Sequence, residues 1–210
     1  MVLTEVTGRR MKSHARWWLV FLLPMLPLVW LVDRALALDL GADPAQAIVQ
    51  FTGIWTLRLL WITLAITPLR RIFHWGWLQR YRRMMGLYAL FYAIVHLLAF
   101  ATFILGWRPD LLLRELSERP YIIVGTLALL LLIPLGVTST RGMQRRLGPK
   151  WAKLHRLVYL IALLAMLHFI WQIRSSFQEQ LIYGLILAWL LGYRLWKRHR
   201  APVRKPSRMA

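Results

Sequence analysis

The sequence contains no cysteine, and only 8 of its 210 residues are acidic. The absence of cysteine excludes thiolate-ligated haem, cysteine-ligated iron–sulfur clusters, disulfides and redox-active thiols. Any metal site must therefore rest on histidine, of which there are six. The 28 lysines and arginines give a formal net charge of +20, which in a soluble chain would suggest nucleic-acid binding. Here the basic residues flank apolar runs, where they set membrane topology, so we expect a lipid bilayer and no nucleic acid as partner.

Long apolar runs make up most of the chain. Apolar residues account for 59% of it and the mean hydropathy is +0.49, too apolar for an ordinary soluble domain. The runs predict an all-α membrane protein, a six-transmembrane-helix bundle. Its predicted spans are residues 17–40, with a kink at Pro24 and Pro27, then 48–69, 84–107, 121–138, 148–173 and 181–196. The first run also loosely fits a secretory signal peptide, but Asp33 and Arg34 interrupt the expected cleavage region, so we predict a retained span.

The distribution of positive charge predicts the orientation. Of the 28 basic residues, 22 lie in four regions that fall on one side of the membrane. These regions are the N-terminal segment, residues 70–83, residues 141–156 and residues 194–208. By the positive-inside rule both termini are cytoplasmic. We therefore expect a basic cytoplasmic segment over residues 1–16, a six-span domain over 17–196 and a basic cytoplasmic tail over 197–210.

Two histidines and an arginine are predicted to lie deep within the membrane. His96, His168 and Arg58 are each 12 or 13 residues from the nearest basic residue at the cytoplasmic border of their helix, which is roughly 18 to 20 Å. An imidazole in hydrocarbon is costly unless it is paired or binds a metal. Two neutral imidazoles from two helices suit the axial positions of a b-type haem, and we predict His96 and His168 as these ligands. The alternative is a histidine hydrogen-bonded to a neighbouring helix.

Two further residues have open roles. Arg58 could pair with a haem propionate or a quinone head group, or extend its charge between helices toward the membrane surface. His155 lies 13 residues before His168, about 20 Å away along a helix. It could ligate a second haem together with a loop residue such as His74, contact a propionate or a flavin, or simply begin the helix as a polar residue. No catalytic residue is predicted.

Four segments resemble a known family. They are TPLRR (Thr67 to Arg71), RRMMGLYALFYAIVH (Arg82 to His96), TSTRGMQRRLG (Thr138 to Gly148) and WAKLHRLVYLIALLAMLHFIW (Trp151 to Trp171). They are similar to the MsrQ (YedZ) family, the haem-binding membrane subunit of the bacterial protein-methionine-sulfoxide reductase system. The likeness covers essentially all six spans. More distantly, the chain resembles the ferric-reductase-like transmembrane domain that NADPH oxidases share.

The resemblance implies a cytochrome b of the bacterial inner membrane. Such a protein passes electrons from the quinol pool, or from a cytoplasmic flavin reductase, to a periplasmic molybdopterin subunit that reduces methionine sulfoxide in oxidised proteins. It further implies haem b held by His96 and His168, with His155 also implicated, and an associated FMN.

The chain departs from the wider superfamily in two places. Arg83 stands near where those oxidases carry a second histidine on the third span, which leaves one or two haems open. Only 14 residues follow Trp196, so we expect no nucleotide-binding domain and a separate electron donor.

Two other classes of protein are compatible with the residues alone. In a haem-free proton-relay or transport protein, Arg58, His96 and His168 would line a path through the membrane. In a simple membrane anchor, the chain would only recruit a partner. Haem in the purified protein would support electron transfer, and its absence would support a relay. A simple anchor would still work after loss of either histidine.

Overall fold

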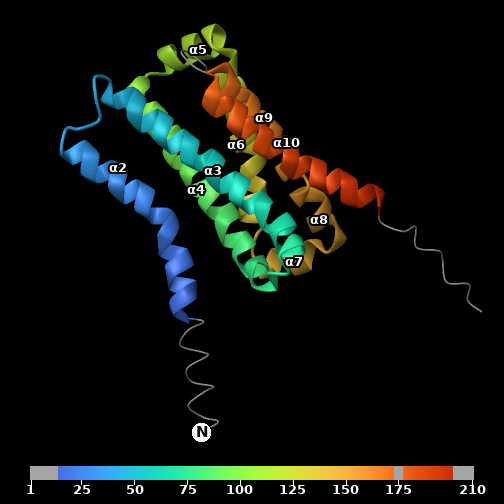
Figure 1. Cartoon of the computed structure of the whole chain (residues 1–210). Helices are drawn as coiled ribbons and strands as arrows, with labels where there is room; N and C mark the ends of the chain where they lie inside the picture. The colour runs from blue at the N-terminus through green and yellow to red at the C-terminus, as the bar shows by residue number, and fades with distance from the viewer. Residues whose placement is uncertain (1–13, 173–176, 201–210) are drawn as a thin grey trace, which may run out of the picture.

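The structure is a computed structural model that describes residues 14–172 and 177–200, and these residues form helices joined by turns (Figure 1). The predicted all-α class is therefore confirmed for the described part. Most of the basic N-terminal segment, Arg174 with its neighbours and the tail from residue 201 lie outside the described residues. The helices are His14–Leu36, which includes the 3₁₀ turn η1 (Leu23–Met25) and α2 (Leu26–Leu36), then α3 (Pro44–Ile72), η2 (Gly76–Tyr81), α4 (Arg82–Ala99), the π-helix η3 (Phe100–Ile104), α5 (Pro109–Glu118), α6 (Pro120–Val137), α7 (Arg141–Leu147), α8 (Pro149–His155), α9 (Leu157–Trp171) and α10 (Gln178–His199).

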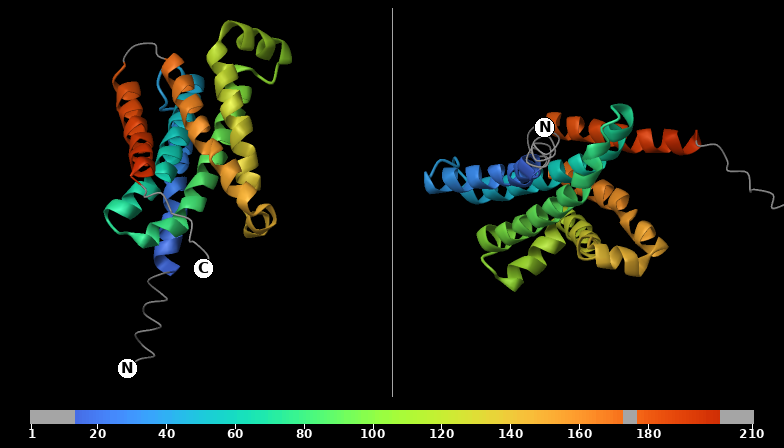
Figure 2. Two further views of the ribbon diagram at one scale, coloured as in Figure 1. Left: turned by 90° about the vertical axis from the view of Figure 1, so that its right-hand side faces the viewer. Right: turned by 90° about the horizontal axis from the view of Figure 1, so that it is seen from below.

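Five of the described helices are long and apolar enough to cross a membrane, which supports a multi-pass membrane protein. They are His14–Leu36, Pro44–Ile72, Gly76–Ile104, Pro120–Val137 and Pro149–Trp171. The predicted sixth span corresponds to α10, which runs between the same two ends of the molecule (Figure 2). Its apolar part is confined to residues 181–193, which covers roughly 20 Å of a hydrocarbon core of about 30 Å. The count of six spans stays a prediction.

Prolines set where several helices begin. Pro44, Pro109, Pro120 and Pro149 each occupy the first turn of a helix, where the missing N–H costs nothing and the fixed φ suits the helix. At α3 the side chain of Asp43 also accepts a hydrogen bond from the Gln46 N–H at 3.0 Å, which caps the first turn of the helix. These starts divide the apolar chain into separate helices.

The first helix is broken where the prolines predict a kink. Pro24 lies inside the 3₁₀ turn η1, because proline cannot donate the backbone hydrogen bond that would continue an α-helix. Two tyrosines of α4 satisfy carbonyls at this break: the Tyr88 hydroxyl donates to the Phe21 carbonyl at 2.6 Å, and the Tyr92 hydroxyl donates to the Pro24 carbonyl at 2.7 Å. The kink therefore docks the first helix onto α4.

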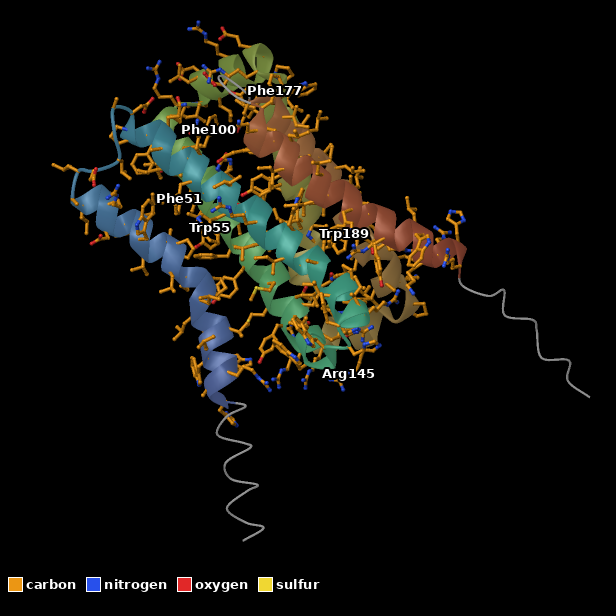
Figure 3. All side chains as sticks on the ribbon, viewed as in Figure 1. Phe51, Trp55, Phe100, Arg145, Phe177 and Trp189 are labelled. Carbon is orange, nitrogen blue, oxygen red and sulfur yellow. The ribbon has the colours of Figure 1, made fainter. Side chains whose placement is uncertain are left out.

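Two antiparallel helix pairs form the centre of the molecule. Helix α3 packs along α4, and α6 packs along α9 (Figure 2). The side chains of Leu64, Ala89 and Ile161 in this core are almost fully buried. Outside this core, Phe51 on α3 stacks on Trp30 of α2 with ring centres 5.1 Å apart (Figure 3).

The charged residues separate the molecule into two ends. The C-terminal parts of α3 and α10 lie at the same end as α7 and α8, which we call the basic end; Arg145 on α7 marks it in Figure 3. The ion pairs of the described residues lie at the opposite end or next to it, such as that between Arg114 and Glu118 at 2.7 Å on α5. This arrangement agrees with the predicted clustering of the basic loops on one side.

Three connections are more helical, or less regular, than predicted. The mixed-charge stretch after Trp107 contains α5, which i,i+4 ion pairs stabilise. The basic stretch after Arg70 contains the end of α3 and the 3₁₀ helix η2. The predicted fifth span is irregular at Arg156, whose N–H donates to the Lys153 carbonyl in a 3₁₀ pattern. This irregularity separates α8 from α9 within the single long helix Pro149–Trp171.

Candidate functional site

The structure brings His96 of α4 and His168 of α9 together between the two helix pairs. Their ring centres are 6.3 Å apart and the ring planes cross at 79°. Both side chains are partly buried. The pair lies toward the end of the bundle opposite the basic end, because His168 contacts Tyr121 in the first turn of α6.

His96 is held against helix α3 by one hydrogen bond and one glycine. Its Nδ1 lies 2.9 Å from the Val49 carbonyl oxygen. A carbonyl can only accept, so Nδ1 carries the proton and Nε2 keeps its lone pair. The ring lies against Gly53, where an added Cβ would be 3.0 Å from the Cε1 atom of His96. The glycine therefore lets the imidazole approach the backbone of α3.

His168 is held against helix α6 in the same way. Its Nδ1 lies 2.6 Å from the Tyr121 carbonyl oxygen, which again leaves the lone pair on Nε2. A Cβ at Gly125 would be 2.7 Å from both the Cε1 and Nδ1 atoms of this ring. The Gln172 amide lies 3.1 Å from the free Nε2 and donates to it. His168 thus has the closer glycine contact of the two imidazoles.

The two histidine environments repeat with identical spacing. Each carbonyl partner lies 47 residues before its histidine, and each glycine follows four residues after that carbonyl residue. We call Val49 with Gly53, and Tyr121 with Gly125, the two cradles. Sequence reasoning missed them because a glycine in an apolar helix carries no chemistry of its own. The signal that could have revealed them is the equal glycine-to-histidine spacing in the two halves of the chain.

The paired imidazoles would suit a metal that takes two ligands from the protein. With metal–nitrogen bonds of about 2 Å, two such imidazoles have ring centres roughly 6 Å apart. Metal-bound histidines usually donate the other ring N–H to a carbonyl or carboxylate, as both rings do here. The described residues contain no group of three or more His, Cys, Asp or Glu that could hold a metal ion. A haem iron suits this pair, because the porphyrin supplies the other four donors.

Arg58 lies apart from the two imidazoles. On α3, Gly53 is opposite His96 of α4, and Thr63 is opposite Gly86 of α4, so the two helices run antiparallel. Arg58 is five residues beyond Gly53, which places it roughly 8 Å nearer the basic end than His96. The predicted common depth therefore holds for the histidines and is wrong for Arg58. Its Nε donates to the Tyr183 hydroxyl of α10 at 2.7 Å, and its guanidinium lies 4.9 Å from the Trp55 ring centre.

His155 lies at the basic end, at the C-terminus of α8. Its ring stacks on Trp151 with centres 4.0 Å apart, and its Nδ1 lies 3.2 Å from the Trp151 carbonyl oxygen. The Nε2 atom is buried without a hydrogen-bond partner. His74, considered as its partner in a second site, lies in the turn between α3 and η2. The structure thus places His155 outside the His96–His168 pair.

Gln172 competes for the atom that would bind a metal. The single lone pair of His168 Nε2 cannot accept the Gln172 hydrogen bond and bind iron at once. In wild-type protein, haem binding must first break the hydrogen bond from Gln172 to His168, and a neutral hydrogen bond is worth about 1 kcal/mol. The Gln172→Leu variant has no such bond, so we expect it to bind haem about fivefold more tightly. Titration of haem into haem-depleted protein, followed by absorbance, measures the change. Gln79→Leu, an exposed substitution at the basic end, is the control; weaker binding in Gln172→Leu would instead give the amide a supporting role.

These features define a class of protein: a helical membrane protein that pairs two histidines inside its bundle. A family model described as "Ferric reductase like transmembrane component" matches residues 52–166, which include most of the two central helix pairs. No solved structure matches the chain.

Curated relatives identify the family more closely. A protein of Xanthomonas axonopodis pv. citri named "Protein-methionine-sulfoxide reductase heme-binding subunit MsrQ" is 51% identical over 80% of this chain and 78% of its own length. Proteins with the same name are 54% identical in Xanthomonas campestris pv. campestris, over 76% of this chain and 73% of theirs, and 45% identical in Polaromonas naphthalenivorans, over 89% and 86%. The chain belongs to the MsrQ family, as the resemblance predicted.

Proposed function

We propose that this chain is the haem-binding membrane subunit of a protein-methionine-sulfoxide reductase, with one haem b held between His96 and His168. The observation that carries the proposal is the pair of imidazoles 6.3 Å apart, each with Nδ1 on a carbonyl, so that the lone pair lies on Nε2. At His168 a metal would displace the Gln172 amide from this atom. The names of the relatives, which describe a heme-binding subunit, support the same cofactor. The bound haem would supply one-electron transfer.

The chain's own residues would position and insulate the cofactor. The Val49 and Tyr121 carbonyls fix each histidine in the tautomer that ligates through Nε2, and the cradle glycines let the rings pack close to α3 and α6. The apolar helices around the pair exclude water, which is a main control on the reduction potential of a haem. The chain offers no acidic residue between Asp43 and Asp110, or between Glu118 and Glu179, for substrate chemistry beside the pair.

We infer an electron route from the basic end to the opposite end. The positive-inside rule supports a cytoplasmic basic end in the bacterial inner membrane. Electrons would come from quinol or a cytoplasmic flavin reductase and leave to a periplasmic molybdopterin subunit that reduces methionine sulfoxide. The position of the pair beside the first turn of α6 favours this direction, because it shortens the last step to a periplasmic partner.

Three finer assignments remain proposals. Arg58 would neutralise a propionate or a quinone head group, which its partly buried guanidinium beside Tyr183 suits. The buried, unpartnered Nε2 of His155 is compatible with a second haem or a flavin at the basic end. FMN is a prediction from the family resemblance alone.

A haem-free proton relay has less support. Such relays use chains of Asp, Glu and His side chains, whereas each of these histidines binds a backbone carbonyl of its own cradle. An absorption spectrum decides between the two: reduction by dithionite should give the sharp bands of a low-spin haem. A colourless protein after expression with ample haem would reject the proposal, and haem per chain distinguishes one site from two.

The angle between the imidazoles predicts a further spectroscopic property. If the ring planes kept their 79° crossing with both Nε2 atoms on one iron, the two histidines would present their π-orbitals in nearly perpendicular directions. The d-orbitals of a low-spin ferric haem would then be almost degenerate. We expect a strongly anisotropic electron paramagnetic resonance signal, with its largest g value above that of a haem with parallel imidazoles. A signal typical of parallel planes would show that the pair reorients on binding haem.

A further inference from the structure

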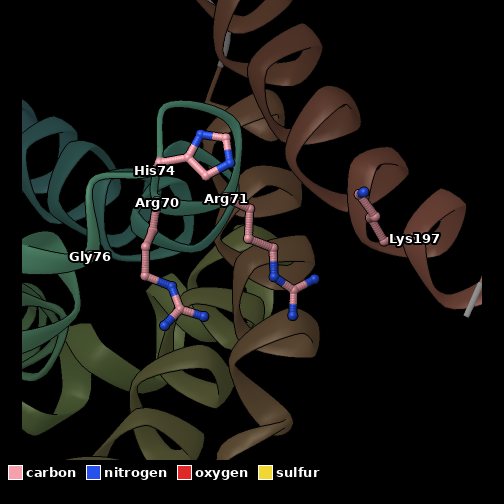
Figure 4. A pocket seen from close by; sticks show the side chains of 5 residues that line it. All are labelled: Arg70, Arg71, His74, Gly76 and Lys197. Carbon is pink, nitrogen blue, oxygen red and sulfur yellow. The ribbon is translucent and has the colours of Figure 1, made fainter.

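An open hollow lies at the basic end, between the C-terminal ends of α3 and α10. Its volume is about 540 Å³, and Arg70, Arg71, His74, Gly76 and Lys197 line it. Figure 4 shows the two arginines at the end of α3, His74 on the turn beside them, and Lys197 across the opening on α10. We call these residues the basic hollow. Three permanent cations and a histidine thus line one open hollow, from the end of α3, the turn after it and α10. The Lys197 ammonium also lies 5.1 Å from the Trp196 ring centre.

In the part of the chain that the structure describes, no acidic side chain pairs with the basic hollow. The sequence has no Asp or Glu from residue 44 to 109, and none after Glu179, which begins α10 at its other end. The ion pairs of the described residues involve other arginines, namely Arg34, Arg108, Arg114 and Arg119. Clustered like charges repel one another unless an anion binds among them. The unpaired positive charge of these described residues therefore favours an anion from outside the chain.

The hollow is built by specific backbone contacts. His74 adopts φ 58°, a left-handed conformation that a non-glycine residue adopts at a cost, and this turn carries its side chain to the hollow. On the other wall, the Arg194 guanidinium donates to the Leu64 carbonyl of α3 and to the Leu190 carbonyl of its own helix. Arg194 thereby fastens α10 to α3 one turn before Lys197. The two walls are held at a fixed separation.

Exposed aromatic rings beside the hollow mark the depth of the membrane surface. Phe73, Trp75 and Trp77 alternate with the hollow residues along the turn and are 52%, 46% and 43% exposed. Phe73 stacks on Trp75 with ring centres 4.9 Å apart, and Trp75 and Trp77 are 6.4 Å apart. Aromatic side chains of this kind concentrate at the level of lipid head groups. The basic hollow therefore lies where a phospholipid phosphate would lie.

We propose that the basic hollow binds the phosphate of an anionic phospholipid, with the acyl chains running beside α3 and α10. Arginine binds phosphate with paired donors, and lysine contributes a further charge. A phosphatidylglycerol head group offers a net negative charge to this cluster, whereas phosphatidylcholine offers a phosphate already paired with its own cation. The bound lipid would fasten α10, the least apolar of the predicted spans, to the rest of the bundle.

The test compares lipid retention by matched variants of the full chain in nanodiscs. The hollow variant is Arg70→Gln/Arg71→Gln/Lys197→Gln. The control is Arg145→Gln/Arg146→Gln/Lys150→Gln, which removes the same charge from exposed sites at the same end. With equal phosphatidylcholine and phosphatidylglycerol, native mass spectrometry should show phosphatidylglycerol bound to the wild type and to the control. Because each basic residue near an anionic surface contributes about fivefold to affinity, the loss of three should weaken phosphatidylglycerol binding by the hollow variant about 100-fold.

Other outcomes would overturn the proposal. Equal retention in all three proteins would show that the hollow binds no lipid, and an equal loss in both variants would show a general effect of charge. A second measurement separates lipid from free phosphate: phosphatidylglycerol should raise the melting temperature of the wild type but not of the hollow variant. The same rise from inorganic phosphate in phosphatidylcholine nanodiscs would exclude the lipid as the occupant.

Discussion

Replacement of His168 by alanine should abolish haem retention while the protein still inserts into the membrane. The imidazole would be one of only two protein ligands, and its loss removes an iron–nitrogen bond together with the contact to the Tyr121 carbonyl. Insertion depends on the length of apolar helices and not on one side chain. We expect the haem-to-protein ratio to fall by more than about tenfold, since even residues that only support a metal ligand cost 10- to 100-fold when removed. His96→Ala should behave alike.

The control for this experiment is a histidine outside the pair. His199→Ala removes an exposed imidazole at the basic end and should leave haem content unchanged. His155→Ala should have a milder effect than His168→Ala, because His155 lies about 20 Å along the chain from the pair. Haem content is measured by pyridine haemochrome and protein by amino-acid analysis. Near wild-type haem in purified His168→Ala would refute the assigned ligand.

A single methyl group at Gly125 should also expel haem. The Cβ of an alanine there would lie 2.7 Å from the Cε1 and Nδ1 atoms of His168, closer than carbon atoms approach without displacement. The ring must move away from α6, which breaks the 2.6 Å contact between Nδ1 and the Tyr121 carbonyl oxygen and turns Nε2 away from the iron. We expect Gly125→Ala to lower haem retention by about tenfold, or to convert the remaining haem to a high-spin spectrum.

Two matched glycine variants separate this effect from general helix stability. At Gly53 the new Cβ would be 3.0 Å from the His96 ring, so Gly53→Ala should be milder than Gly125→Ala. At Gly86 on α4 the nearest atom would be the Thr63 Cγ2 at 3.6 Å, an ordinary contact, so Gly86→Ala should keep its haem. Alanine favours a helix over glycine by about 1 kcal/mol, so propensity alone predicts no loss. Identical spectra for all three variants would contradict the role of the cradles.

The fold class and the histidine pair follow from local features of the sequence. Apolar length predicts helices that span a membrane, and basic clusters predict which ends lie together. His96 and His168 could be matched because each lies at a similar distance from the basic end of its own helix. A polar residue inside a long apolar run is costly, so its position alone indicates that a partner exists.

What the sequence could not predict depends on how the helices pack. The depth assigned to Arg58 is wrong because residues were counted from Arg70 on α3 but from Arg83 on α4. These two arginines are not at the same level along the bundle. Helix α3 continues to Ile72, and the 3₁₀ helix η2 precedes α4. The amphipathic helix α5 was missed because its ion pairs form only once the backbone is helical. The glycine contacts of the cradles are a property of neighbouring helices, and helical periodicity within one segment does not reveal them.

The repeated cradle links cofactor loading to assembly of the bundle. Each histidine belongs to a different antiparallel pair, α3 with α4 or α6 with α9, so a ligand that needs both imidazoles binds only when the two hairpins have docked. By mass action, such a ligand at 1,000 times its dissociation constant stabilises the docked form by about 4 kcal/mol. Haem supply would thereby act as a checkpoint in biogenesis: chains that have not received the cofactor would have loosely associated hairpins, and membrane proteases would degrade them first.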